Sequence, residues 1–171
     1  VFNIILGEAK AGDLTYEKLP IEINMNIGSF DTGLSAFNLE NDEVYRVYDI
    51  NARFITEKAD KVFSLLKKVI FETEFEDKDD IRKILQEAKT GIENELLNSG
   101  HETVMNRSLS YISKSACYAE KTSGVEVYNL IDDILTDYDN KFEWFRKELV
   151  DIRDKVFTKG GLRSHIAAEK E

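Results

Sequence analysis

The spacing of apolar residues predicts helices along most of the chain. Apolar side chains recur every three or four positions in several segments, which is the period of a helix with one buried face. The segments with this period are 62–70, 81–96, 104–112, 127–135 and 142–156. Asp77 is the expected N-cap of the second helix. That helix should end near residues 98–100, because Gly100 suits a left-handed closing residue.

The first 27 residues give a less uniform pattern. Residues 1–6 are typical of the end of an apolar helix, and a loop should follow over residues 7–13. From residue 21 to residue 27, apolar and polar positions alternate as in a strand, whereas Thr15 and the residues after it open like a capped helix. Pro20 would cost that helix one backbone hydrogen bond. We favour the helix.

Alternation with a period of two predicts strands in the next segment and at the C-terminus. Residues 30–36 and 48–54 should pair as a hairpin, with the polar run 40–43 as its turn. Residues 157–168 alternate after Gly160 and Gly161, which predicts a closing strand. We therefore expect one α+β domain over residues 1–171, in which a small antiparallel sheet, the hairpin plus the C-terminal strand, packs with several helices.

Composition restricts the environment and the partners of the chain. The formal net charge of −10 argues against nucleic acid and against an anionic membrane surface, and no run approaches the ~18 apolar residues of a spanning helix. The lone Cys117 excludes an internal disulfide and favours a reducing compartment. With no signal sequence at its start, the chain is expected in the cytoplasm, with an organelle matrix as the alternative. Because it starts at Val1 rather than Met, it is expected to be part of a longer chain.

The two histidines do not form a known zinc motif. His101-Glu102 opens like the His-Glu-x-x-His helix, but Met105 stands where the second histidine is required. The inverted motif His-x-x-Glu-His is absent, and His165 is far along the chain. We expect His101 to lie near a helix start and to bond to its neighbours.

Other candidate chemistry also has a structural interpretation. Cys117 stands among small residues and is expected to pack rather than to act as a nucleophile. The pairs Asp79-Asp80 and Asp132-Asp133 are expected on solvated helix faces. A calcium loop from Asp77 would need glycine at position 82 and glutamate at position 88, where the chain has arginine and alanine. We assign no catalytic, cofactor-binding or metal-binding residue.

A group of polar, aromatic and small residues in the middle of the chain carries a family resemblance. These residues are Ser99, Gly100, His101, Arg107, Ser110, Tyr111, Ser113, Ala116, Tyr118, Glu120, Ser123, Gly124 and Tyr128. Their order and spacing resemble the presequence-protease and falcilysin branch of the pitrilysin/insulinase-type zinc peptidases. Residues 14–28, 70–73 and 157–171 extend the resemblance over nearly the whole chain.

The resemblance implies a place in a larger architecture. Proteins of this branch have two similar halves that close around a chamber for unfolded peptides, and the first half holds the zinc. This chain is similar to the first domain of the second half, whose late arginine and tyrosine we do not assign to Arg107 and Tyr111. Arg107 is expected to cap or pair within the segment after Gly100, so that Arg107→Ala should lower thermal stability.

The function that the resemblance implies is therefore indirect. We expect the chain to be part of a zinc-dependent metalloendopeptidase that degrades unstructured peptides, with no cofactor bound by the chain itself and with zinc in the N-terminal half of the parent. Alone it should be inactive, and its partners should be the catalytic half and unfolded peptides. The alternative is a non-enzymatic scaffold of the same fold, like the core subunits of respiratory complexes. A third alternative is an unrelated binding module.

Overall fold

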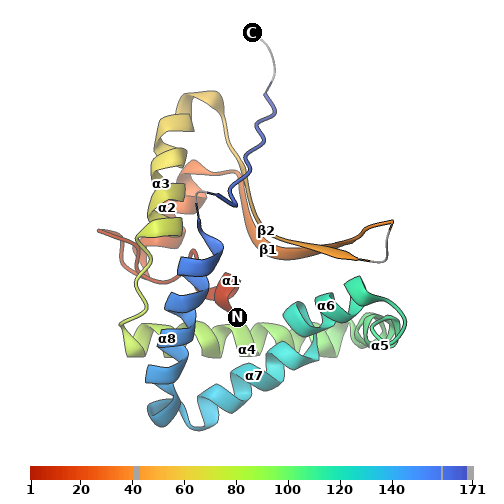
Figure 1. The fold of residues 1–171 in the computed structure, drawn as a ribbon. Helices are drawn as coiled ribbons and strands as arrows, with labels where there is room; N and C mark the ends of the chain where they lie inside the picture. Colours follow the sequence, from red (N-terminus) through yellow and green to blue (C-terminus); the bar gives the residue numbers. More distant parts are fainter. Residues whose placement is uncertain (41–42, 159, 169–171) are drawn as a thin grey trace.

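The chain folds into helices from which a long β-hairpin extends to one side (Figure 1). The computed structural model describes residues 1–40, 43–158 and 160–168. Its helices are α1 Phe2–Ile5, α2 Lys18–Asn26, α3 Ala59–Phe71, α4 Lys78–Asn98, α5 Gly100–Leu109, α6 Lys114–Ser123, α7 Val125–Thr136 and α8 Tyr138–Val156, with a 3₁₀ turn at Thr56–Lys58 before α3. Together with the hairpin they confirm the predicted α+β class.

The predicted hairpin is confirmed. Strand β1 (Ser29–Asn38) pairs antiparallel with β2 (Val44–Arg53). The register places Phe30 opposite Ala52 and Leu34 opposite Tyr48, so the two predicted faces coincide. Part of the predicted polar turn, residues 41–42, lies outside the described residues.

The predicted closing strand is wrong. Residues 160–168 form neither helix nor strand, and the sheet seen in the described residues has two strands. Leu162 and Ile166 are 74% and 72% exposed. Alternating apolar residues form a strand only where a neighbouring strand pairs with their backbone and a core covers one face. In the described structure this segment meets neither condition.

The N-terminal segment forms two short helices. Phe2 and Ile5 of α1 are buried in the core. The helix favoured for the next segment is confirmed as α2, but it begins at Lys18, so the cap predicted at Thr15 is wrong. Pro20 is the third residue of α2, where a backbone amide has no acceptor within the helix. The expected loss of a hydrogen bond therefore does not arise.

The two central helices follow the predicted period, and one of their ends differs from the prediction. The Asp77 side chain accepts hydrogen bonds from the amides of Asp79 and Asp80 at 3.1 and 3.0 Å, which confirms the N-cap of α4. Helix α4 ends at Asn98 as expected, but Gly100 does not adopt a left-handed conformation. It is instead the first residue of α5, so the predicted role of Gly100 as a closing residue is wrong.

Helix α6 has no counterpart among the sequence predictions. Helices α7 and α8 show the predicted stripes, with Ile131 and Leu149 each buried in the core. In α6, all of whose residues the structure describes, the buried residue is Glu120. A helix that buries a carboxylate and no large apolar side chain gives no periodic apolar signal.

The core lies where α1, α4, α7 and α8 meet beneath α2, α3 and the start of the hairpin (Figure 1). Its fully buried residues include Ile5, Leu19, Ile84, Leu85 and Ile131. Burial of each such side chain contributes about 1.5–3 kcal/mol. No helix in the described residues is long and apolar enough to cross a membrane.

Candidate functional site

Helices α5 and α6 form an elbow between the end of α4 and the start of α7. The turn between them is closed by local hydrogen bonds. The Ser110 hydroxyl donates to the carbonyl of Arg107 at 2.6 Å, and the Ser113 side chain accepts from the amide of Ala116 at 3.4 Å as the N-cap of α6. Both serines belong to the group of residues that carries the family resemblance. Ser110 lies at the end of α5, and Ser113 lies at the start of α6.

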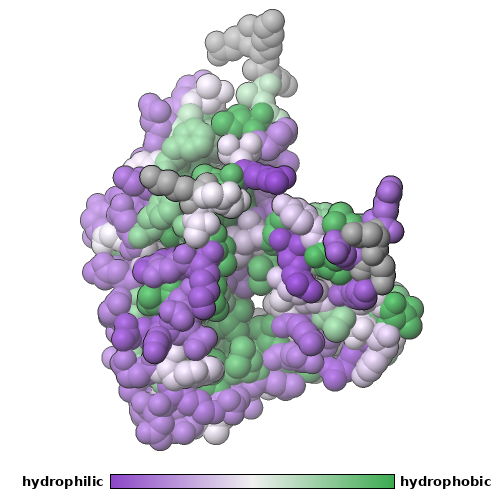
Figure 2. Space-filling model, viewed as in Figure 1, coloured by the Kyte–Doolittle hydropathy of each residue, from purple (hydrophilic) through white to green (hydrophobic). Residues whose placement is uncertain are grey.

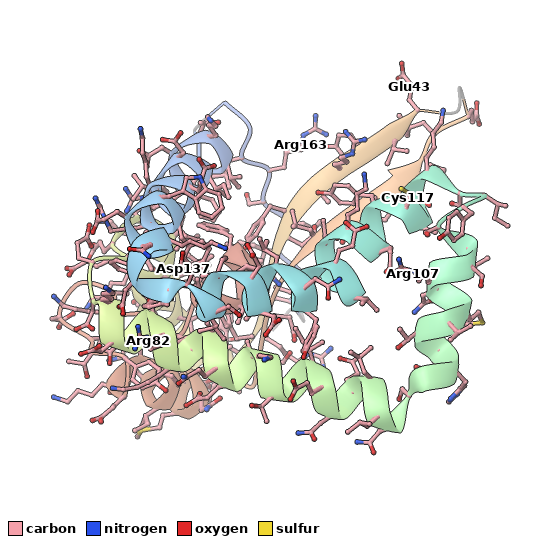
Figure 3. The ribbon with its side chains drawn as sticks, turned by 90° about the horizontal axis from the view of Figure 1, so that it is seen from below. Glu43, Arg82, Arg107, Cys117, Asp137 and Arg163 are labelled. Atoms are coloured by element: carbon pink, nitrogen blue, oxygen red, sulfur yellow. The ribbon has the colours of Figure 1, made fainter. Side chains whose placement is uncertain are left out.

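An ion pair joins the two arms of this elbow. Arg107 Nη1 lies 3.3 Å from Glu120 Oε1, and Glu120 is only 7% exposed. Figure 3 shows Arg107 on α5 at the side that faces α6. Of the two expected roles of Arg107, capping or pairing, the structure shows pairing, and the partner lies on α6 rather than on the helix that carries Arg107. A carboxylate this buried needs a compensating charge, and Arg107 supplies it from the neighbouring helix.

The junction of α6 and α7 requires a glycine. A Cβ atom at Gly124 would lie 2.3 Å from Glu120 Oε2 and 2.6 Å from the Glu120 carbonyl oxygen. Real Cβ atoms do not approach oxygen that closely, so the bare Cα of Gly124 leaves the space that the Glu120 carboxylate occupies.

Polar contacts also fix α7 against α4. The Tyr128 hydroxyl donates to Glu93 Oε1 at 2.8 Å, and Lys89 Nζ lies 2.8 Å from Asp132 Oδ1. The hydrogen bond to Asp132 raises the pKa of Lys89, and the hydrogen bond to Glu93 raises the pKa of Tyr128. Lys89 and Tyr128 therefore stay protonated to higher pH than the same side chains would without these hydrogen bonds.

A groove of about 540 Å³ lies between the outer end of the hairpin and α6. We call it the basic groove, and its lining residues are Glu43, Val44, Arg46, Lys114, Cys117, Tyr118 and Lys121. The Arg46 guanidinium lies over the Tyr118 ring, 5.3 Å from its centroid. Figure 3 shows Cys117 on α6 beneath the hairpin end that carries Glu43.

A model of a known protein family matches most of this chain. The matching family model describes a domain associated with peptidases of metallopeptidase family 16, subfamily C, and it covers residues 1–134, which is more than half of the 171 residues. The chain belongs to this peptidase-associated family. The elbow and the basic groove both lie within the matched residues.

Three curated relatives of this peptidase-associated domain are much longer than the chain. Protein HypA of Clostridium perfringens is 28% identical over 169 residues, which are 98% of this chain and 17% of the relative. Presequence protease 1 of Arabidopsis thaliana is 21% identical over 169 residues, 96% of this chain and 15% of the relative. The mitochondrial presequence protease of Gibberella zeae is 25% identical over 114 residues, 64% of this chain and 11% of the relative. The chain thus spans 17% or less of these relatives, and the predicted resemblance to presequence proteases is confirmed.

The donor residues that the structure describes in this peptidase-associated domain do not come together as a zinc site. No group of three or more His, Cys, Asp or Glu side chains in the described residues could hold a metal ion. His101, at the second position of α5, is 81% exposed, and its nearest acidic partner is Glu102 at 3.9 Å. His165 is exposed in the segment after α8, and Cys117 is half-buried on α6.

The paired acidic residues have structural roles. Asp80 pairs with Lys83 at 3.0 Å, beside the cap that Asp77 provides. Asp132 pairs with Lys89 across two helices, and Asp133 pairs with Lys141 at 2.8 Å. These carboxylates therefore form surface ion pairs, in agreement with the predicted solvated faces.

Helix α5 and the turn after it carry large apolar side chains that this domain leaves exposed. We call this surface the α5 apolar face, and it consists of Val104 (67% exposed), Met105 (56%), Leu109 (42%), Tyr111 (80%) and Ile112 (83%). Figure 2 shows green side chains among white and purple ones at the edge of the molecule where α5 lies. Exposed apolar groups are frequent where proteins contact one another, so the α5 apolar face is a candidate contact surface.

Sequence reasoning missed the basic groove. Lys114, Tyr118 and Lys121 are spaced as neighbours on one side of a helix, and this spacing was the signal available in the sequence. It could not be used because α6 itself was not predicted. Arg46 comes from a strand, and only the fold brings it to Tyr118.

Proposed function

We propose that this domain forms a non-catalytic wall of the peptide chamber of a zinc-dependent metalloendopeptidase that degrades unstructured peptides. Hydrolysis is carried out by zinc held in the catalytic half of the parent chain. The observation that carries the proposal is the family membership over residues 1–134 of a chain that spans 17% or less of its relatives. Two of these relatives are named presequence proteases.

The distribution of metal donors supports a non-catalytic role for this segment. A zinc peptidase site needs three protein ligands and an open position for water. The two histidines lie far apart in sequence, at the start of α5 and after α8, and no donor group forms in the described residues. The chemistry of the parent is therefore assigned to another part of its chain.

The α5 apolar face supports the remainder of the parent chain as the partner of this domain. Tyr111 and Ile112 are each at least 80% exposed at the turn of the elbow. The Arg107–Glu120 pair and the glycine at position 124 hold that turn in place. An apolar surface on a rigid support is suited to stable packing against another domain.

Enclosure gives such a wall a purpose. A closed chamber excludes folded proteins by size and removes water from the peptide that it surrounds. Walls without catalytic groups still select substrates, because they contact the peptide away from the scissile bond.

The test uses the intact parent protein. We expect it to cleave an unstructured peptide, to lose that activity with a metal chelator and to regain it with zinc. The isolated 171-residue chain should cleave nothing under either condition. An intact parent that cleaves no peptide with zinc present would contradict the proposal and would support the scaffold alternative instead.

A further inference from the structure

We propose that the basic groove binds the acidic segment of an unstructured peptide. This inference rests on the proposed function, because it names the peptide chemistry that the wall recognises. It is carried by the charge, the geometry and the size of the groove between β2 and α6.

The groove is positive on a negative molecule. Three cations, Arg46, Lys114 and Lys121, line it together with the carboxylate of Glu43, so the formal charge of its lining is 3 − 1 = +2. The chain as a whole carries a formal charge of −10. An acidic peptide is therefore repelled by most of the surface and attracted at this groove, which favours specific over diffuse binding.

The groove is built from two elements with suitable spacing. Lys114, Tyr118 and Lys121 follow one another at intervals of four and three residues, so they lie on one side of α6. Val44 and Arg46 are two residues apart on β2 and therefore share a face of the hairpin. The two rows face each other across the groove and can hold a peptide between them.

The Arg46 guanidinium is held in place by the Tyr118 ring. The guanidinium carbon lies 5.3 Å from the ring centroid, and a cation–π contact at this distance attracts the guanidinium without using its N–H donors. Neither Arg46 nor Lys121 has an ion-pair partner within the part of the chain that the structure describes. Both side chains line the groove, where a carboxylate supplied by a ligand would meet them.

In a second cavity, the cations are already paired with a carboxylate of the chain itself. The cavity of about 320 Å³ between α4 and the start of α8 is also lined by an arginine, Arg82. There Asp139 lies 2.9 Å from Arg82 and 2.8 Å from Lys78. The basic groove differs because its cations outnumber its carboxylate.

The volume and the apolar lining of the basic groove also suit a peptide. A volume of about 540 Å³ falls within the range of ~300–1,000 Å³ typical of ligand sites, which is larger than a single ion requires. Val44 and the Tyr118 ring supply apolar contact beside the cations. A peptide that carries carboxylates next to apolar side chains satisfies both parts of this surface.

The experiment measures fluorescence anisotropy of a labelled unstructured peptide rich in Asp and Glu, and of a matched peptide with Asn and Gln in their place. We expect the 171-residue chain to bind the acidic peptide more tightly. Arg46→Gln and Lys121→Gln should each weaken that binding by about three- to tenfold and leave the neutral peptide unchanged. Raising the ionic strength to about 1 M should remove the preference.

Lys147→Gln, on the exposed side of α8 away from the groove, is the matched control and should bind like the unaltered chain. Thermal melting of each variant shows that it is folded. Binding of both peptides that neither groove substitution changes would overturn the basic groove as the site while leaving the wall function in place. Failure of the acidic peptide to bind would also overturn the groove, whereas the wall function is decided separately by peptide cleavage in the intact parent.

Discussion

Glu120 is a carboxylate in an almost fully buried position, and Arg107 is the cation that compensates it. Arg107→Ala should lower the free energy of unfolding by about 1–2 kcal/mol, because the carboxylate loses its partner, although Arg107 itself is partly exposed to water. Urea denaturation measures the change. The double variant with Glu120→Gln should be less destabilised than the sum of the single variants.

The matched control for this prediction is Arg146→Ala. Arg146 lies 3.2 Å from Glu143 and 3.6 Å from Glu76, whose side chains are 74% and 64% exposed, so loss of these two pairs should change stability by less than about 1 kcal/mol. Equal effects of the two arginine substitutions would contradict a special role for the Arg107–Glu120 pair.

At the residue scale, some roles can be predicted from the sequence and others cannot. The sequence predicts that Arg107 caps or pairs within the segment after Gly100, and the structure shows a pair, but with Glu120 on the next helix. Arg46 could not be assigned, because its partner Tyr118 is 72 positions away and on a helix that the sequence did not predict. Contacts between distant residues depend on the packing of whole elements, which local patterns do not contain.

At the scale of elements, the junction of α6 and α7 offers a direct test. Gly124→Ala should destabilise the fold by about 1–3 kcal/mol, because the new Cβ would collide with the Glu120 carbonyl as well as its side chain. Gly91→Ala is the control, since Gly91 lies within α4 with nothing within 4 Å of a Cβ. It should stabilise by about 0.5–1 kcal/mol because alanine is the better helix former. Thermal unfolding of both variants would contradict this account if the two shifts had the same sign.

The periodicity of apolar residues predicts some of the helices and not others. Helices α3, α4, α7 and α8 each bury an apolar stripe, and their patterns predict them. Helix α6 buries Glu120 instead, so the pattern is absent. Residues 160–168 show the converse, because their alternation predicts a strand that forms no pairing in the described structure. The period of a segment predicts its conformation only where a partner buries one of its faces.

At the scale of the whole molecule, the α+β class follows from the sequence, but the unequal covering of the surface does not. The core around Ile84 and Ile131 is closed, whereas the α5 apolar face is open. Sequence patterns identify apolar positions, and they do not tell which of them lie in the core of the domain and which stay exposed on its surface. The buried and the exposed apolar positions can be told apart only once the fold places α5 outside the core.

Because buried and exposed apolar residues differ in this way, substitutions should affect the stability of the isolated chain and of the parent differently. Ile112 is 83% exposed, so Ile112→Ser should change the stability of the isolated chain by less than about 0.5 kcal/mol. Ile84 is fully buried, and Ile84→Ala should cost about 2–5 kcal/mol in either context. In the intact parent, Ile112→Ser should lower the melting temperature, because a hydroxyl would then replace apolar contact with the neighbouring domain. Differential scanning calorimetry of both proteins makes the comparison. An Ile112→Ser parent that melts like the unaltered parent would show that the α5 apolar face is not where this domain meets the rest of its chain.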